Sequence, residues 1–217
     1  MAAGGHPTDP VAGAGSPDEQ AALARNDRYL AAFVERLNLC PFARRCREDG
    51  KLHRRVLSGA RPVEAARAAI AEIEALPEES VEVALLICPG FPAGPREFEA
   101  FLAEVRTAAT QFYVVSFHPD LPEDLADAHR AVGFIRRSPD PTLQLVRTSL
   151  LDRVRGENTG GSVFVDASKL SRTELLALSM PEPLSDRIAR LNLETLRREG
   201  AGVLRSLLAD LKGSGRP

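Results

Sequence analysis

The sequence contains no tryptophan, only three lysines and three cysteines, and no long apolar run. No hydrophobic segment approaches the roughly 20 residues of a membrane-spanning helix, which argues against a membrane protein. Basic and acidic residues number 28 and 30, so the chain lacks the excess of basic charge that is typical of nucleic-acid-binding proteins. Its amino-terminal segment also lacks the basic start and apolar centre of a signal peptide. We therefore expect a cytoplasmic protein that binds neither nucleic acid nor membranes.

The residues that are present are typical of a globular protein. Hydrophobic residues make up 44% of the 217 positions, which is too high a fraction for a disordered chain. Of the basic residues, 25 are arginines, whose guanidinium groups bind carboxylates and phosphates through two parallel hydrogen bonds. The cysteines, Cys40, Cys46 and Cys88, are odd in number and irregularly spaced. This pattern fits free thiols in a reducing compartment rather than a disulfide framework.

Changes in composition along the chain divide it into three parts. Residues 1–15 consist of small and polar residues with almost nothing to bury, so we predict a disordered tail there. Ser16 and Glu19 then have the spacing of a capping box, which predicts the start of a helix. We expect one α/β domain over residues 16–213 and a short flexible end at 214–217.

Strand and helix patterns alternate within this domain. The hydrophobic patterns predict strands at 52–57, 81–88 and 112–117, with a short edge strand at 162–166. They predict helices at 16–40, 62–76, 94–105 and 184–211, the last interrupted at Gly200, and a second capping box at 171–174. Pro141 and the apolar residues after it predict a further helix that ends near Gly156. The alternation predicts an α/β fold with a small three- or four-stranded sheet, helices packed on it and a helical C-terminal region.

Two candidate residues follow directly after predicted strands, where active sites of α/β proteins often lie. Cys88 follows the strand at 81–88 and His118 follows the strand at 112–117. If these strands are parallel neighbours, the two side chains lie on the same edge of the sheet. Asp120 stands two residues after His118 and could orient the imidazole, so His118 is a candidate general acid, general base or metal ligand.

Cys40 is a candidate because of the basic segment that follows it. Six basic residues lie between Arg44 and Arg55, and cationic neighbours lower the pKa of a thiol. We therefore predict a reactive thiolate at Cys40, and we predict that Cys40, His118 and Asp120 form a catalytic group.

A third candidate site precedes the helix that Pro141 is expected to begin. Asp140 has the position of an N-cap residue, and two arginines lie shortly before it. The amino terminus of a helix binds anions, and nearby arginines strengthen that binding. We therefore predict that an anionic substrate is bound by Arg136, Arg137, Ser138 and Thr142.

Four segments carry a resemblance to a known family, and they occur in its order. They are residues 37–43 (Leu-Asn-Leu-Cys-Pro-Phe-Ala), 116–119 (Ser-Phe-His-Pro), 137–143 (Arg-Ser-Pro-Asp-Pro-Thr-Leu) and 192–200 (Asn-Leu-Glu-Thr-Leu-Arg-Arg-Glu-Gly). Over roughly residues 26–212 the chain resembles the bacterial family known as domain of unknown function 1415. The chain departs from that pattern at Arg136 and Asp140, and residues 159–183 look like added material. The resemblance implies no activity.

Three hypotheses about function follow. The leading one is a small enzyme that acts on a small anionic metabolite, with Cys40 and His118 as the reactive pair. The first alternative is a metal-binding protein, with Cys40, Cys88 and His118 as candidate ligands. The second alternative is a non-catalytic protein that binds a ligand or a partner. The sequence predicts no particular substrate, reaction class, cofactor or oligomeric state.

Overall fold

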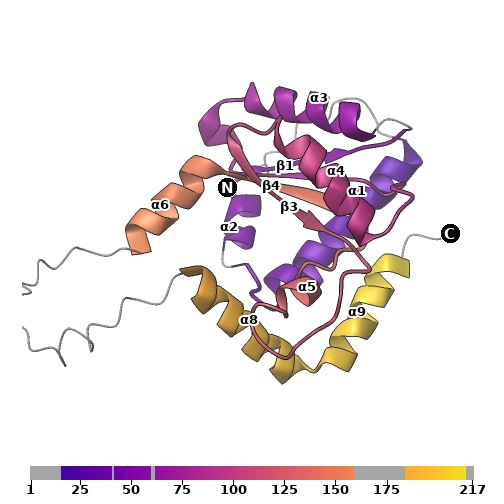
Figure 1. Ribbon diagram of the computed structural model, residues 1–217, viewed down its shortest axis with the longest axis vertical. Helices are drawn as coiled ribbons and strands as arrows, with labels where there is room; N and C mark the ends of the chain where they lie inside the picture. Colours follow the sequence, from indigo (N-terminus) through magenta and orange to yellow (C-terminus); the bar gives the residue numbers. More distant parts are fainter. Residues whose placement is uncertain (1–15, 41, 60–61, 159–183, 214–217) are drawn as a thin grey trace, which may run out of the picture.

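The fold is built on a four-stranded mixed sheet, seen in a computed structural model that describes residues 16–40, 42–59, 62–158 and 184–213 (Figure 1). The strands are β1 (Leu52–Val56), β2 (Val83–Ile87), β3 (Phe112–Phe117) and β4 (Thr142–Arg147). Their order in the sheet is β1-β2-β4-β3. β1 is parallel to β2, and β4 is antiparallel to both of its neighbours.

Helices surround this sheet and form the end of the chain. They are α1 (Pro17–Tyr29), the π-helix η1 (Leu30–Glu35), α2 (Ala43–Glu48), α3 (Pro62–Glu74), the 3₁₀ helix η2 (Glu78–Ser80), α4 (Pro95–Arg106), α5 (Val132–Ile135), α6 (Thr148–Asn158), α8 (Leu184–Glu199) and α9 (Ala201–Gly213). The predicted α/β fold, small sheet and helical C-terminal region are confirmed. The expected tail, the edge strand at 162–166, the capping box at 171–174 and the flexible end lie outside the described residues.

The sheet has an apolar layer on each of its faces. Successive side chains of a strand point to opposite faces, and in β2 they sort accordingly into two clusters. Ala84 and Leu86 pack with α3 and α4, whereas Leu85 and Ile87 pack with α1, η1, α5, α8 and α9. Figure 1 shows α3 on one side of the sheet and α8 and α9 on the other. Burial on both faces explains why β2 is apolar at every position.

The predicted capping box begins the first helix. The Ser16 hydroxyl accepts a hydrogen bond from the backbone N–H of Glu19 (3.3 Å), and the Glu19 carboxylate accepts one from the N–H of Ser16 (3.0 Å). The helix then widens into the π-helical η1 and ends at a turn before residue 41. Gly200, with φ of +86°, separates α8 from α9 as expected.

The prediction of a helix beginning at Pro141 is wrong, because residues 142–147 form β4. Leu143 and Leu145 alternate with less buried residues and join the cluster on the α3 and α4 face. A proline before the first residue of a strand is as compatible with its ladder as with a helix start. The strand is decided by pairing on both sides, with β2 and with β3, which no local pattern reveals. The helix begins only at Thr148.

The second and third strands, β2 and β3, are not neighbours, since β4 lies between them. Both are antiparallel to β4, so they are parallel to each other. Ile87 and Phe117 are both paired with Thr142, and therefore Cys88 and His118 follow at the same edge of the sheet, as predicted. In the part of the chain that the structure describes, no helix has the length and apolar character to cross a membrane.

Candidate functional site

His118 lies at the sheet edge, buried and bonded to backbone groups. Its Nδ1 accepts a hydrogen bond from the N–H of Asp120 (3.1 Å), and its Nε2 lies 3.3 Å from the carbonyl oxygen of Ala93. These partners assign the proton to Nε2. The ring packs against Phe98, with centroids 5.8 Å apart. The carboxylate of Asp120 points to Lys212, at 3.5 Å, so Asp120 contacts His118 through its backbone.

The predicted anion-binding residues are engaged with the protein itself. The hydroxyls of Ser138 and Thr142 both donate to the carbonyl oxygen of Asp140, at 2.6 and 2.9 Å. Arg137 donates to the carbonyl oxygen of Leu121 at 2.7 Å, and the carbonyl oxygen of Arg136 accepts from the N–H of His118. No helix begins at Thr142, so the helix amino terminus expected there is absent, and anion binding by Arg136, Arg137, Ser138 and Thr142 stays a prediction.

Cys40 and His118 are next to different apolar clusters of the fold. Cys40 follows Leu39, which belongs to the cluster on the α8 and α9 face of the sheet. His118 packs against Phe98, which belongs to the cluster on the opposite face. Cys88 is also buried in that second cluster and therefore lies on the His118 side.

The expected lowering of the Cys40 pKa is wrong. Burial raises the pKa of its thiol, and hydrogen bonds from the backbone of Phe42 and Ala43 oppose that rise only in part. The basic residues after Cys40 are occupied elsewhere, since Arg44 and Arg47 pair with Glu35, at 3.8 and 2.7 Å. Burial likewise raises the pKa of Cys46 and of Cys88 to about 12. Such thiols are protonated at neutral pH and are poor nucleophiles.

No group of three or more His, Cys, Asp or Glu side chains within the described ranges has the geometry of a metal site. The candidate ligands Cys40, Cys88 and His118 are all within those ranges. The metal-binding hypothesis therefore has no support from the geometry.

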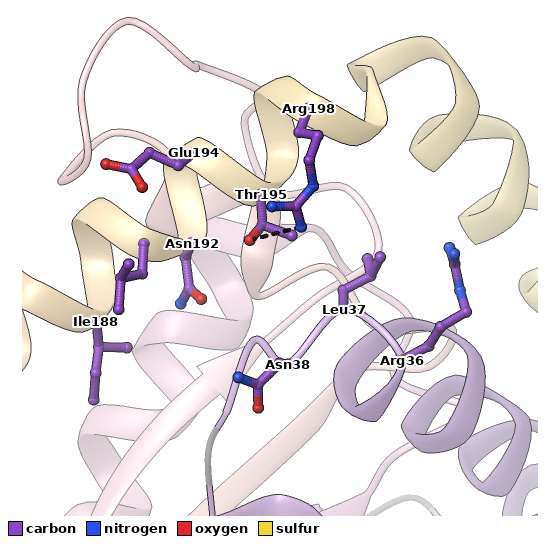
Figure 2. A pocket seen from close by; sticks show the side chains of 9 residues that line it. Arg36, Leu37, Asn38, Ile188, Asn192, Glu194, Thr195 and Arg198 are labelled. Carbon is purple, nitrogen blue, oxygen red and sulfur yellow. Dashed lines mark hydrogen bonds between the residues drawn. The ribbon is translucent and has the colours of Figure 1, made fainter.

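A pocket of about 340 Å³ lies instead between the turn after η1 and the helix α8 (Figure 2). The residues that line it come from these two segments only. They are Arg36, Leu37, Asn38, Ile188, Leu191, Asn192, Glu194, Thr195 and Arg198. Two of the segments that carry the family resemblance, 37–43 and 192–200, thus meet in space.

The wall formed by the turn has an unusual backbone. Asn38 has φ of +52° and is the one non-glycine residue with positive φ in the described part of the chain. Asparagine tolerates this left-handed conformation better than most residues, and such conformations concentrate at functional sites. The buried side chain of Asn192 donates from Nδ2 to the carbonyl oxygen of Leu39 at 3.1 Å. This hydrogen bond ties α8 to the turn and fixes the width of the pocket.

One end of the pocket is positively charged. Arg36 and Arg198 extend from its two facing walls (Figure 2), and both pair with the carboxylate of Glu199, at 3.5 and 3.7 Å. Two guanidinium groups and one carboxylate leave a formal charge of +1 in this group. Glu194 also lines the pocket, but it points away from the turn in Figure 2 and pairs with Arg190 at 3.1 Å.

The other end of the pocket is apolar. Ile188 lies one helical turn before Asn192, away from the two arginines (Figure 2). Leu191 also lines the pocket, and 48% of its surface is exposed. The pocket therefore combines a cationic end, two amides at its centre and an exposed apolar surface.

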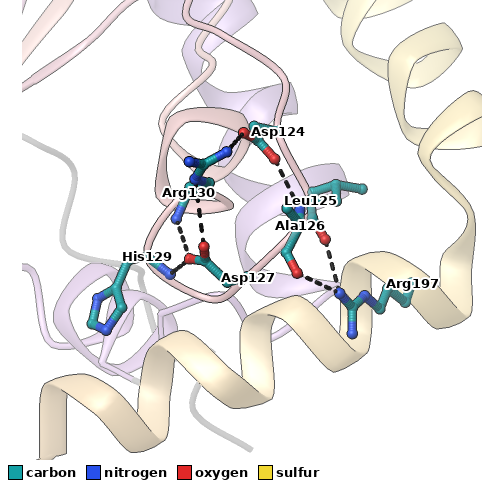
Figure 3. A network of polar contacts seen from close by, with 7 residues as sticks. All are labelled: Asp124, Leu125, Ala126, Asp127, His129, Arg130 and Arg197. Carbon is teal, nitrogen blue, oxygen red and sulfur yellow. Dashed lines mark hydrogen bonds and ion pairs between the residues drawn. The ribbon is translucent and has the colours of Figure 1, made fainter.

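The position of α8 is also fixed by the loop that follows β3. Arg197 donates to the carbonyl oxygens of Leu125 and Ala126, at 2.9 and 3.1 Å (Figure 3). Arg130 holds the loop in shape, because it pairs with Asp124 at 2.9 Å and with Asp127 at 3.5 Å. The wall of the pocket is therefore anchored from outside by a polar network.

None of the candidate residues of the sequence lies in this pocket, because the pattern of residues 37–39 is typical of core packing. Leu37 and Leu39 are indeed buried, but Asn38 between them is not apolar and adopts a left-handed conformation. Two signals were available in the sequence. Asn38 lies between two core leucines, and Asn192 lies on the apolar face of the last long helix.

Comparisons with known proteins agree with the resemblance of the sequence motifs. A family model described as "Protein of unknown function (DUF1415)" matches residues 21–162, which is more than half of the chain. No curated protein and no solved structure matches the chain.

Proposed function

Since the chain belongs to the DUF1415 family, whose function is unknown, we propose its function from the pocket: it is a binding protein for a small organic anion. The observation that carries this proposal is that two arginines at one end and an exposed leucine line the same pocket. A carboxylate with a short apolar tail matches both ends.

The charge of the arginine group favours an anion over a neutral or cationic ligand. Arg36 donates a hydrogen bond to the carbonyl oxygen of Ala32, and Arg198 donates one to the hydroxyl of Thr195. These bonds use only part of the capacity of each guanidinium, which carries five N–H donors. A carboxylate placed between them would accept paired hydrogen bonds, which are stronger than bonds between neutral groups. The amides of Asn38 and Asn192 line the middle of the pocket and suit a polar group near the carboxylate.

The size of the pocket restricts the ligand. A volume of about 340 Å³ lies at the low end for small-molecule sites, which excludes most nucleotides and long chains. Burying Leu191 under an apolar tail would contribute through the hydrophobic effect, at roughly 25 cal/mol per Å² removed from water. The class of ligand is the small anion expected from the sequence, although we assign it to different residues.

Catalysis by Cys40, His118 and Asp120 stays a separate prediction. Cys40 lies two residues after Asn38 but is not among the residues that line the pocket.

Three free thiols support the prediction of a cytoplasmic protein, because a reducing compartment preserves them.

Titration calorimetry with three six-carbon probes tests the proposal. Hexanoate should bind, whereas hexanol and hexylamine, which lack the carboxylate, should bind far more weakly. Arg36→Met and Arg198→Met should each weaken hexanoate binding by about three- to fivefold, because both side chains are largely exposed and their ion pairs are worth ~1 kcal/mol at most. The double variant should abolish detectable binding.

The matched control is Arg205→Met on α9, which removes an exposed arginine that pairs with Glu123 at 3.2 Å. It should leave hexanoate binding unchanged. Leu191→Ser should weaken binding of hexanoate but not of acetate, since only the longer chain reaches the apolar end. Equal binding of hexanoate and hexanol, or equal effects of the Arg36 and Arg205 variants, would contradict the proposal.

A further inference from the structure

A second cavity, of about 240 Å³, lies on a different part of the molecule. It is formed by η2, the residues that flank β1 and β2, the end of β4 and the start of α6. Its charged lining residues are Lys51, Glu78, Glu79, Glu82, Arg147 and Arg153. None of these residues lines the pocket between the 36–38 turn and α8.

Arg147 is one of two buried charged residues of this cavity, with 3% of its surface exposed; the other is Glu82, with 6%. Its Nε donates to the carbonyl oxygen of Val81 at 2.8 Å, and its Nη1 donates to the side-chain oxygen of Gln111 at 2.7 Å. The guanidinium stacks on Phe112, with its central carbon 4.6 Å from the ring centroid. These contacts hold the side chain in one orientation.

The remaining nitrogen of Arg147, Nη2, is buried and has no hydrogen-bond acceptor among the residues that the structure describes. A buried cationic donor without an acceptor is costly, and nearly all such donors in proteins are satisfied. Protein groups satisfy the other two nitrogens, and no residue that the structure describes supplies the missing acceptor. The adjacent cavity provides the space for it.

The charges of the cavity lining, Arg147 included, are balanced. Lys51 and Arg45 both pair with the buried carboxylate of Glu82, at 3.0 and 3.5 Å. Glu78 accepts a hydrogen bond from the hydroxyl of Ser149 at 2.5 Å, which holds its carboxylate against the start of α6. The lining therefore has three basic and three acidic side chains. A simple anion would meet the acidic residues as well as Arg147, whereas a ligand with both charges suits both sets.

We propose that this cavity is a second binding site, which takes a small α-amino acid. The ligand carboxylate accepts a hydrogen bond from Nη2 of Arg147, and the ligand ammonium donates to the carboxylates of Glu78 and Glu79. A cavity of about 240 Å³ limits the ligand to a short side chain. The site is independent of the anion pocket and does not depend on the function proposed for it.

The test uses the full chain and three probes: L-alanine, acetate and methylamine. Calorimetry should detect L-alanine, and acetate and methylamine should each bind at least about tenfold more weakly, because each carries only one of the two charges. Glu79→Gln should weaken L-alanine binding by about fivefold or more through loss of one charged partner. Glu64→Gln, which removes an exposed carboxylate on α3, is the matched control and should have no effect.

Arg147→Lys tests the central contact, because lysine keeps the charge but lacks the fork of donors. If this variant folds by circular dichroism, it should lose L-alanine binding. If it does not fold, the Glu79 variant and the three probes still test the proposed amino-acid site. Absence of L-alanine binding to the wild-type chain, binding of acetate as tight as that of L-alanine, or an unchanged affinity in Glu79→Gln would each overturn the proposal.

Discussion

The ion pair between Arg25 and Asp140 leads to the most quantitative prediction. It joins α1 to the residue that precedes the Pro141–β4 segment, 115 positions along the chain. Two parallel hydrogen bonds, each of 2.9 Å, connect Nε and Nη2 of Arg25 to the two carboxylate oxygens. Both side chains are largely buried, with 13% and 12% of their surfaces exposed. The carbonyl oxygen of Asp140 also accepts hydrogen bonds from the hydroxyls of Ser138 and Thr142. Asp140 therefore holds together the junction between α1 and the start of β4.

Asp140→Asn removes the charge and leaves Arg25 without its partner. Breaking a fully buried pair costs about 3–5 kcal/mol, whereas an exposed pair is worth less than ~1 kcal/mol. Because a small part of this pair is exposed, we expect the free energy of unfolding to fall by roughly 2–3 kcal/mol. With an m-value of about 2 kcal/mol per molar urea, the midpoint of unfolding should fall by roughly 1–1.5 M.

Urea unfolding monitored by circular dichroism measures this effect. Arg25→Met and the double variant complete a double-mutant cycle, which should give a coupling energy of about 1–2 kcal/mol. Glu72→Gln is the matched control, because its pair with Arg55 is exposed on both sides and should be worth less than ~0.5 kcal/mol. If Asp140→Asn and Glu72→Gln have equal effects, or if the Arg25 and Asp140 effects are additive, the pair does not stabilise the junction.

Three further predictions concern the turn, the pH dependence and the thiols. Asn38→Ala should lower the free energy of unfolding by about 1–2 kcal/mol, because its positive φ is costly for alanine, whereas Asn38→Gly should be nearly neutral; thermal unfolding of both compares them. Hydrogen bonds from Arg47 hold the pKa of Glu35 below its ordinary value, so the stability they contribute is present above the unfolded pKa of about 4.3 and is lost as the pH falls through the folded value. Glu35→Gln should therefore be less stable than wild type at neutral pH, with a difference that closes in acid; urea midpoints across this pH range would show no such convergence if the pair were unimportant. Since burial raises the pKa of Cys46 and Cys88 to about 12, Ellman's reagent at pH 8 should label both only after unfolding, and rapid labelling of a folded Cys40→Ser variant would contradict their burial.

The sequence by itself determined the elements that depend on neighbours within a few residues. The capping box at Ser16, the apolar β2 and the break at Gly200 all appear where local patterns predict them. Side-chain periodicity and backbone preference are properties of short segments, so they can be evaluated without the rest of the chain. The α/β class follows from the order of such segments.

Only the tertiary structure decided β4 and the pocket. Thr142–Arg147 becomes a strand because two partners flank it, and Leu39 and Asn192 meet across 153 positions. His118 looked like a reactive group in sequence, yet backbone atoms from Ala93 and Asp120 occupy both of its ring nitrogens. Burial, which raises the pKa of the Cys40 thiol despite its basic neighbours in sequence, is likewise a property of the folded chain. Contacts between distant segments decide desolvation and hydrogen bonding, and these in turn decide which polar residues remain available to a ligand.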